Sequence, residues 1–262
     1  MPELPEVEAA AGRLRGLAIG HTIVRVQVVH PAIRRRLPAG AQRALTGRQI
    51  DRVERRAKIQ LLHLDDGSLL EVHFRMTGDW EFTPASAQPP AHSRLRLELS
   101  SGVTVHLVDG RALAVVRRHA PGAWVSPPLG PEPLTEAFTV EAFAAALATR
   151  RGPIKAVLLD QRVVAGVGNI YAAEALWVAR IHPAAVARTL SVARLTRLRD
   201  AIREVLEHAP SGRYYAREEA EAVAAWRVYD AEDAPCPRCQ TRIRRLVQGA
   251  RSSYYCPRCQ RR

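Results

Sequence analysis

The first residues of the chain, MPELPEVE, place an imino acid among three carboxylates. Initiator methionine is normally removed when the next residue is as small as proline, and its removal would leave Pro2 with a free secondary amine. An α-amino group has a pKa of about 8, so part of it is unprotonated at neutral pH. Such an amine, beside Glu3 and Glu6, can attack an electrophilic carbon and form an iminium. The alternative is a frayed acidic terminus without function.

Four cysteines near the C-terminus form two CxxC pairs: Cys236, Cys239, Cys256 and Cys259. Sixteen residues separate the pairs, a spacing typical of a structural zinc site with four thiolate ligands. Each pair is expected to form a knuckle, with a short hairpin between the two. The same segment has eight arginines and no acidic residue, so it would present a cationic surface around Arg251 to a DNA groove. A redox pair is the alternative.

A glycine-rich turn at 166–168 precedes Asn169 and a predicted helix, and its backbone N–H groups would suit a phosphate. Lys155 and the pair Arg150-Arg151 lie upstream and would add cations near the same phosphates. An ordinary helix start is the structural alternative. Lys58 and Lys155 are the only lysines among 39 basic residues, and lysine, unlike arginine, can give up its proton. For Lys58 the alternative is a solvated basic surface.

Composition points to a polyanionic partner. The chain has 262 residues, a net charge of +13 and an isoelectric point near 10.6, which makes nucleic acid the first candidate. A GC-rich genome also favours arginine, so arginine content alone decides little. No apolar run reaches the roughly 18 residues of a membrane span, and the N-terminus lacks the order of a signal peptide. Cysteine usage suits a reducing compartment, so we expect a soluble cytoplasmic protein that does not bind membranes.

The apolar pattern separates a strand-rich N-terminal part from a helix-rich C-terminal part. A helix is expected over 7–17, and Lys58 is expected at the start of a strand. The expected strands are 24–28, 59–62, 69–72, 95–99 and 103–107. Short strands with tight turns favour a β-sandwich or barrel over residues 1–126. Met76 is expected where a strand meets a turn, as a core residue or as a wedge between base steps.

The proline-rich piece 127–133 predicts a domain boundary, with a linker over 127–138. The helices expected beyond it are 140–147, with Thr139 as N-cap, then 154–159, 170–179 and 191–208. We assign 139–229 to a helical domain and 230–262 to a zinc ribbon. The sequence therefore predicts an α+β multidomain protein.

Together these segments resemble the formamidopyrimidine-DNA glycosylase family of bacterial base-excision enzymes. The PELPEVE opening, the lysine strand, the HxxMTG turn, the VAGVGNIYAAEALW segment, the IHP tripeptide and the paired CxxC motifs occur in that family's order. The opening favours this branch over its endonuclease VIII relatives. The resemblance implies a β-sandwich, a helix–two-turn–helix domain and a ribbon with one structural Zn²⁺. It further implies a monomer that acts on damaged double-stranded DNA by glycosylase and AP-lyase chemistry.

The resemblance also implies roles for single residues. Pro2 would be the nucleophile at C1′ of the damaged nucleotide, Glu3 the general acid that assists sugar opening, and Lys58 a phosphate contact that supports β-elimination. Arg251 would hold a phosphate beside the lesion and take part in δ-elimination. The residues expected to contact DNA, or to order the terminus beside it, are Glu6, Met76, His92, Arg111, Leu113, Lys155 and Asn169. Base excision from a duplex requires flipping of the nucleotide.

Three departures from the family pattern affect the expected substrate. Leu113 replaces the aromatic residue that stacks beside the orphaned base, and Arg75 stands where the family often has glycine. The region 210–229 lacks the usual glycine-rich loop associated with 8-oxoguanine. We therefore expect stronger activity on ring-opened purines or abasic sites than on 8-oxoguanine.

Three alternatives remain from the sequence. One is an endonuclease VIII-like preference for oxidised pyrimidines, and another is a non-catalytic protein that binds damaged DNA. The third is a zinc-ribbon regulator of transcription, which leaves the first eight residues unexplained. Because Pro2, Glu3, Lys58 and Arg251 are all present, the enzyme is favoured.

Overall fold

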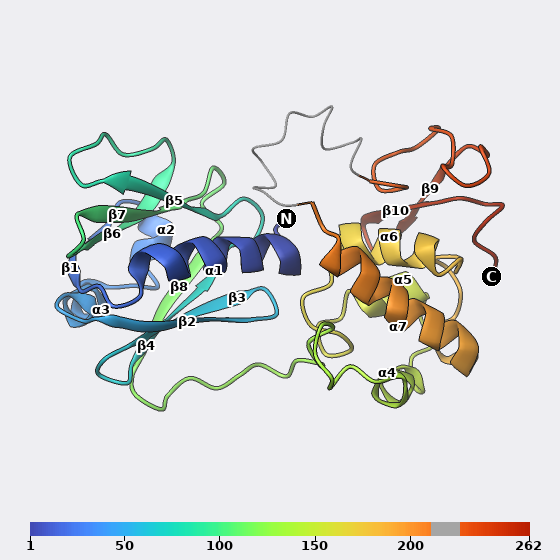
Figure 1. Ribbon diagram of the computed structural model, residues 1–262, viewed down its shortest axis with the longest axis horizontal. Coiled ribbons are helices and arrows are strands. Elements are labelled where there is room, and N and C mark those ends of the chain that lie inside the picture. Colours follow the sequence, from blue (N-terminus) through green and yellow to red (C-terminus); the bar gives the residue numbers. More distant parts are fainter. Residues whose placement is uncertain (211–225) are drawn as a thin grey trace. The chain divides into compact units, whose positions relative to one another are not determined.

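The computed structural model describes residues 1–210 and 226–262. Backbone contacts divide the chain after Ser126 into two compact units, which are described separately below (Figure 1). Residues 127–138 belong to the second unit. Phe138 is buried there against Phe143, with ring centroids 5.1 Å apart, and the Gly130 N–H donates to the Gln161 carbonyl at 2.8 Å.

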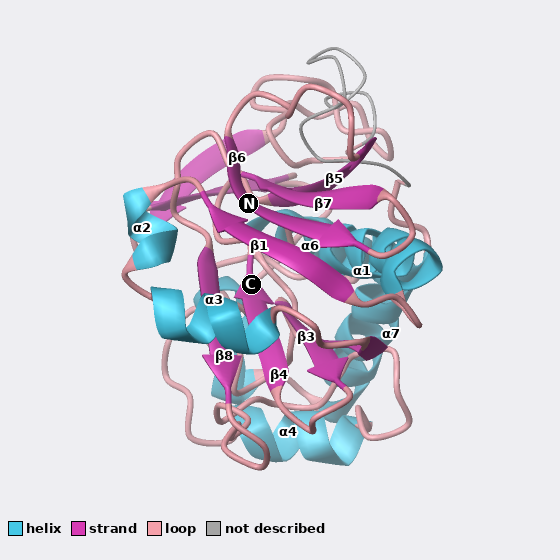
Figure 2. Ribbon diagram, turned by 90° about the vertical axis from the view of Figure 1, so that its left-hand side faces the viewer, coloured by secondary structure: helices cyan, strands magenta, loops and turns pink. Residues whose placement is uncertain are grey.

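The first unit is a sandwich of two four-stranded antiparallel sheets, with three helices. One sheet has the order β1-β6-β7-β5 and the other β2-β3-β4-β8, and Figure 2 shows them as two magenta layers. The strands are β1 (Ile23–Val28), β2 (Ile50–Arg56), β3 (Ile59–Leu64), β4 (Leu69–His73), β5 (Asp79–Pro84), β6 (Ser93–Leu99), β7 (Val103–Val108) and β8 (Val115–His119). The helices are α1 (Leu4–Ala18), α2 (Pro31–Arg34) and α3 (Ala39–Leu45). The expected β-sandwich is confirmed.

The core of this unit lies between the sheets and extends to α1. Buried residues of α1, including Val7 and Leu14, belong to the same apolar cluster as Leu62, Leu97 and Val105 from the two sheets. Helix α1 contacts β2, β3 and β5, so it packs on strands of both layers. The packed helix therefore brings the first residues of the chain to the sandwich.

The second unit begins with helices and ends in a β-hairpin. Its elements are α4 (Val140–Leu147), α5 (Ile154–Leu158), α6 (Asn169–Val178), the 3₁₀ turn η1 (Ala187–Thr189), α7 (Val192–Glu207), β9 (Arg244–Gln248) and β10 (Arg251–Tyr255). Thr139 caps α4 as predicted, since its Oγ1 accepts from the Ala142 N–H at 3.1 Å. Helix α6 packs against both α7 and β10. It therefore connects the helices to the hairpin.

Candidate active site and metal centre

The start of the chain is folded into α1. The Glu3 backbone N–H donates to Glu6 Oε2 at 2.8 Å, and the two residues form a capping box at the helix N-terminus. Their carboxylates therefore lie where the helix dipole favours negative charge. Glu3 is 1% exposed, and Pro2 and Glu6 are also buried. The helix begins at Leu4 rather than at Val7 because a proline is tolerated in the first turn.

The terminal amine is partly buried and lies near charged groups of both signs. In the full chain this amine belongs to Met1, and its burial lowers its pKa from 8.0. Glu3 and Glu6 raise the pKa, whereas Lys58 and Arg111 lower it. A lowered pKa increases the neutral, nucleophilic fraction of an amine at pH 7. Four predicted site residues from three segments of the first unit thus act on the amine.

Lys58 occupies the tight turn between β2 and β3, where Arg56 pairs with Ile59. It therefore precedes the strand instead of starting it, and it is 7% exposed, unlike a lysine on a solvated surface. Ala57 in the same turn has a φ of 52°, a left-handed conformation that costs a non-glycine residue roughly 1 kcal/mol. The packing of the hairpin maintains this strained turn, and the turn positions the lysine.

His73, at the end of β4, is a site residue that the sequence did not single out. It pairs with Ile59 beside Lys58, and its Nδ1 accepts from the Arg75 N–H at 2.9 Å. Burial lowers the pKa of His73 to about 4, and the charges of Arg75 and Lys58 contribute. The imidazole is therefore neutral at pH 7 and adds no charge beside the lysine.

Asp109 connects the loops that carry four of the predicted DNA contacts. Its carboxylate is buried and accepts from Thr77 Oγ1, from the Arg111 N–H at 3.1 Å and from the Ala114 N–H at 2.7 Å. Its own N–H donates to the His92 carbonyl at 3.1 Å. The DGRALA motif contains this aspartate, but nothing in the motif shows that it joins three loops.

The apolar side chains on these loops are exposed. Met76 is 36% exposed and Leu113 is 42% exposed, although large apolar side chains are usually buried in the core. Left-handed, non-glycine residues lie beside or at the candidate positions: Arg75, His92 and Ala112 have φ values of 59°, 60° and 52°. Backbone strain of this kind concentrates at functional sites. The first unit therefore presents two apolar side chains on rigid turns, as a wedge requires.

In the second unit, Lys155 differs from its expected position on a phosphate-facing surface. It is 1% exposed, and its Nζ donates to the Ser252 carbonyl at 2.6 Å. The lysine therefore anchors the start of β10 next to Arg251, which is exposed. Asn169 is the first residue of α6, and its Oδ1 has no hydrogen-bond partner among residues 1–210 and 226–262.

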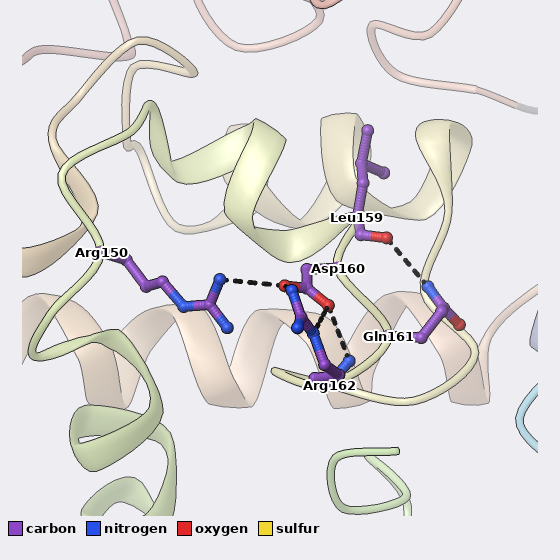
Figure 3. A network of polar contacts seen from close by, with 5 residues as sticks. All are labelled: Arg150, Leu159, Asp160, Gln161 and Arg162. Atoms are coloured by element: carbon purple, nitrogen blue, oxygen red, sulfur yellow. Dashed lines mark hydrogen bonds and ion pairs between the residues drawn. The ribbon is translucent and has the colours of Figure 1, made fainter. Parts of the chain in front are cut away.

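A polar network at residues 159–162 precedes the glycine turn (Figure 3), and Gln161 also bonds to the turn itself. Gln161 Oε1 accepts from the Gly166 N–H at 2.9 Å, while its Nε2 donates to the Val167 carbonyl at 2.9 Å. Asp160 pairs with Arg150 at 3.0 Å and with Arg162 at 2.8 Å. Hydrogen bonding to Arg162 lowers the pKa of Asp160 to about 2. The glycine turn is thus fixed by Gln161, which the sequence did not identify.

The four cysteines come together as predicted. Their Sγ atoms all lie within 4.8 Å of one another; Cys236 and Cys259 are 4.0 Å apart, and Cys239 and Cys256 are 3.4 Å apart. Four sulfurs around zinc at about 2.3 Å stand about 3.8 Å apart in a tetrahedron. The thiols therefore fit one zinc ion, with the predicted hairpin between the knuckles.

Comparison with known proteins supports each part of the chain. The family model of the formamidopyrimidine-DNA glycosylase N-terminal domain matches residues 1–116, the H2TH domain of the same glycosylase matches 129–214, and the zinc finger found in FPG and IleRS matches 234–262. A formamidopyrimidine-DNA glycosylase from Rhizorhabdus wittichii is 42% identical over 273 residues, covering 100% of both chains. The chain belongs to the formamidopyrimidine-DNA glycosylase family.

Solved structures of this family are also similar. The MutM (FPG) protein from Thermus thermophilus has a TM-score of 0.84 at 37% identity, covering 99% of this chain and 98% of its own. A Lactococcus lactis FPG variant in complex with Fapy-dG-containing DNA has a TM-score of 0.89 at 27% identity, covering 100% of both chains. The predicted three-part architecture is thereby confirmed.

Two further expectations from the sequence concern the region 210–229 and the absence of a membrane span. Residues 211–225, which contain most of the region expected to lack the lesion-capping loop, lie outside the described residues. Within the described part of the chain, no helix is long and apolar enough to cross a bilayer.

Proposed function

We propose that this chain is a bifunctional DNA glycosylase and AP lyase of base excision repair, with the amine of Pro2 as nucleophile. The observation that carries the proposal is the burial of Pro2 and Glu3 at the chain start, where the terminal amine, which belongs to Met1 in the full chain, has a lowered pKa near Glu3, Glu6 and Lys58. A structural helix start accounts for Glu3 and Glu6 through their capping box, but it needs no buried lysine. The chain would act as a monomer on damaged duplex DNA in the bacterial cytoplasm.

The chemistry follows from these groups. With Met1 removed, the Pro2 nitrogen attacks C1′ as the bond to the base breaks, and Glu3 gives a proton to the sugar oxygen so that the ring opens to an iminium. Loss of a C2′ proton then expels the 3′ phosphate, and a second elimination expels the 5′ phosphate. Lys58 and Arg251 stabilise the phosphates that leave. A zinc ion bound by the four thiolates supplies structural stability only.

The two units have separate tasks in this proposal. Met76, Leu113 and Arg111, on loops joined through Asp109, would fill the space that the flipped nucleotide leaves. Asn169 and Arg251 would hold the flanking phosphates from the second unit, with Lys155 fixing the strand beside Arg251. His92 would add a DNA contact.

Substrate preference forms a second part of the proposal. We infer that ring-opened purines and abasic sites are better substrates than 8-oxoguanine, because Leu113 offers no aromatic stacking and region 210–229 lacks a glycine-rich stretch. Parallel cleavage of matched duplexes that carry each lesion tests this. Equal or faster excision of 8-oxoguanine would contradict it, and faster excision of oxidised pyrimidines would favour endonuclease VIII-like specificity.

The catalytic proposal is tested by controlling Met1. Protein that begins at Pro2, verified by mass spectrometry, is compared with protein that retains Met1, in which Pro2 nitrogen is an unreactive amide. We expect only the first to cleave an abasic duplex and to form a borohydride-trapped adduct. Equal binding but no adduct from the processed protein would favour a non-catalytic damaged-DNA-binding protein.

A further inference from the structure

An arginine pocket lies beside the zinc-binding thiols, wholly within the second unit. It has a volume of about 640 Å³ and is lined by Arg180, Arg238, Arg258, Arg261, Cys239 and Cys259. All four arginines are exposed. Across residues 1–210 and 226–262, no carboxylate forms an ion pair with any of these guanidinium groups. The pocket therefore holds four positive charges without an acidic partner in the described chain.

The first two arginines are positioned by the end of α6. Arg238 donates from Nη1 to the Trp177 carbonyl at 2.6 Å, and its guanidinium carbon lies 3.7 Å from the centre of the Trp177 ring. Arg180 follows the helix in a left-handed conformation, with a φ of 57°. Both arginines line the same pocket. The fold thus holds two like charges close together.

The other two arginines come from the second knuckle and the chain end. Arg258 lies between two metal-binding cysteines. The backbone carbonyl of Arg261 accepts from the His182 N–H and from Arg194 Nη2, each at 3.1 Å. The backbone therefore keeps Arg261 beside the knuckle. Three separate segments therefore contribute arginines to one cationic pocket. A solvated surface without a ligand does not require such an arrangement.

The negative charge of the zinc centre offsets only part of the positive charge of the four arginines. A Zn²⁺ ion with four thiolates leaves a net charge of about −2, whereas the four lining guanidinium groups carry +4 together. The pocket thus keeps an excess of about two positive charges. Guanidinium groups match phosphate oxygens through paired N–H donors, and a phosphate monoester carries about −1.5 to −2 at pH 7.

The pocket is separate from the candidate DNA contact at Arg251. Strand β10 runs from Arg251 at the hairpin tip to Tyr255 beside Cys256. Four residue steps at about 3.3 Å each place Arg251 roughly 13 Å along the strand from the knuckle that carries Arg258. Arg251 accordingly does not line the pocket.

We propose that the arginine pocket binds a phosphate group, in addition to the phosphates that Arg251 and Asn169 would hold at a lesion. The phosphate comes from one of two sources: backbone DNA beyond the lesion, or a free phosphate or pyrophosphate ion. The site makes no use of Pro2 or Glu3, so failure of the catalytic proposal leaves this one intact.

Pyrophosphate and inorganic phosphate are the probes for a free ion. The zinc-loaded full chain is titrated at constant ionic strength, with the arginine Nε–Hε signals followed by NMR and chloride as the reference anion. We expect saturable shifts with pyrophosphate, weakened about tenfold or more in Arg180→Gln/Arg258→Gln. The control Arg244→Gln/Arg262→Gln removes two charges from the same region outside the pocket, and it should bind as the unchanged chain does.

DNA as the source is tested with undamaged duplexes of about 10 and about 30 base pairs, because each phosphate contact adds about 0.9 to the salt dependence of binding. If DNA fills the pocket, Arg180→Gln/Arg258→Gln lowers the slope by about one on the long duplex only, because one phosphate contact is lost. An unchanged slope with saturable pyrophosphate binding assigns the pocket to a free ion. The absence of both effects overturns the proposal. If the unchanged chain binds no anion and the variant loses zinc, these arginines are counter-ions of the metal centre instead.

Discussion

The region around the chain start and the region around the zinc hairpin use charge in different ways. At the N-terminus the charged groups are buried, of both signs and able to exchange protons: Glu3, Glu6 and Lys58 are each less than 10% exposed. In the hairpin the charged groups are exposed arginines, which keep their proton at any physiological pH. Covalent chemistry needs pKa values that can be shifted, and burial provides the shift. Phosphate binding needs permanent positive charge accessible to the ligand.

The supporting structure differs in the same way. In the first unit the reacting groups lie at a helix start and in a strained β-hairpin turn, and the candidate DNA-contacting loops are joined by Asp109. In the second unit they lie at a helix start, in the loop fixed by Gln161, and in a hairpin closed by a metal centre. Variants that affect one region should therefore change either chemistry or phosphate binding, but not both equally.

The largest expected effect is that of Glu3→Gln. An amide has the shape of the carboxyl group but cannot give a proton, so excision of a damaged base should slow by about 10²- to 10⁴-fold with little change in affinity for damaged DNA. Glu8→Gln is the matched control, because Glu8 lies on the same helix and pairs with Arg15 and Arg55 at the surface. Single-turnover excision rates measure the effect, and equal losses in both variants would contradict the assignment.

Removal of zinc should disrupt the fold of the zinc hairpin and leave the fold of the first unit unchanged. The four thiols lie within 4.8 Å of one another, so without an ion their repulsion and desolvation oppose the fold of the ribbon. Chelation should weaken binding to a lesion duplex at least about tenfold, measured by fluorescence anisotropy. Binding should return with added zinc. An unchanged affinity after verified metal loss would show that the ribbon contributes no DNA contact.

Asp109→Ala should destabilise both the first unit and the loops that carry Met76, Arg111 and Leu113. The change removes the acceptor for the N–H groups of Arg111 and Ala114, and buried donors without a partner cost about 1–3 kcal/mol. Denaturant unfolding should show a loss of about 2–3 kcal/mol, with slower flipping of a fluorescent base analogue. In Asp66→Ala, a control in another turn of the same unit, base flipping should not change. Normal flipping in Asp109→Ala would refute the role of this residue.

Gln161→Ala should act on phosphate binding alone. It removes the donor to Val167 and the acceptor for Gly166, so the turn before Asn169 loses its support. We expect a rise of KM by about three- to tenfold with kcat nearly unchanged. Steady-state kinetics on an abasic duplex distinguish this from an effect on chemistry, since a fall in kcat alone would contradict a role in binding.

The smallest expected effect is that of Asp160 on stability at acid pH. Its pKa is about 2 in the folded chain and 3.8 ordinarily, so between these values the unfolded chain binds more protons. Stability from this group is therefore complete above pH 3.8 and is lost as pH falls toward 2. The Asp160 side chain is 21% exposed and its partner Arg162 is 61% exposed, so solvent screening keeps the contribution below about 1 kcal/mol. Asp160→Asn should remove this part of the acid dependence in urea unfolding, and an unchanged pH profile would contradict the network.

Local signals in the sequence predicted part of this structure well. Helix α4 begins and ends at the predicted residues because Thr139 is a strong N-cap, and CxxC spacing alone predicted the thiol cluster. Strands β2, β5 and β8 were not predicted, since charged residues and, in β5, a proline interrupt their alternation. The burial of Lys155 and the bonds of Asp109 to Thr77 and His92 depend on residues far away in the chain, whereas Gln161 bonds to nearby residues through an irregular loop. Periodicity carries no information about such contacts.

The central claim is that the reacting amine is that of Pro2 and not that of Lys58. Borohydride reduction during reaction of the processed chain with an abasic duplex, followed by digestion and tandem mass spectrometry, locates the adduct directly. Our account predicts the sugar remnant on the N-terminal peptide, at Pro2. An adduct on the peptide that contains Lys58, with Pro2 unmodified, would contradict it.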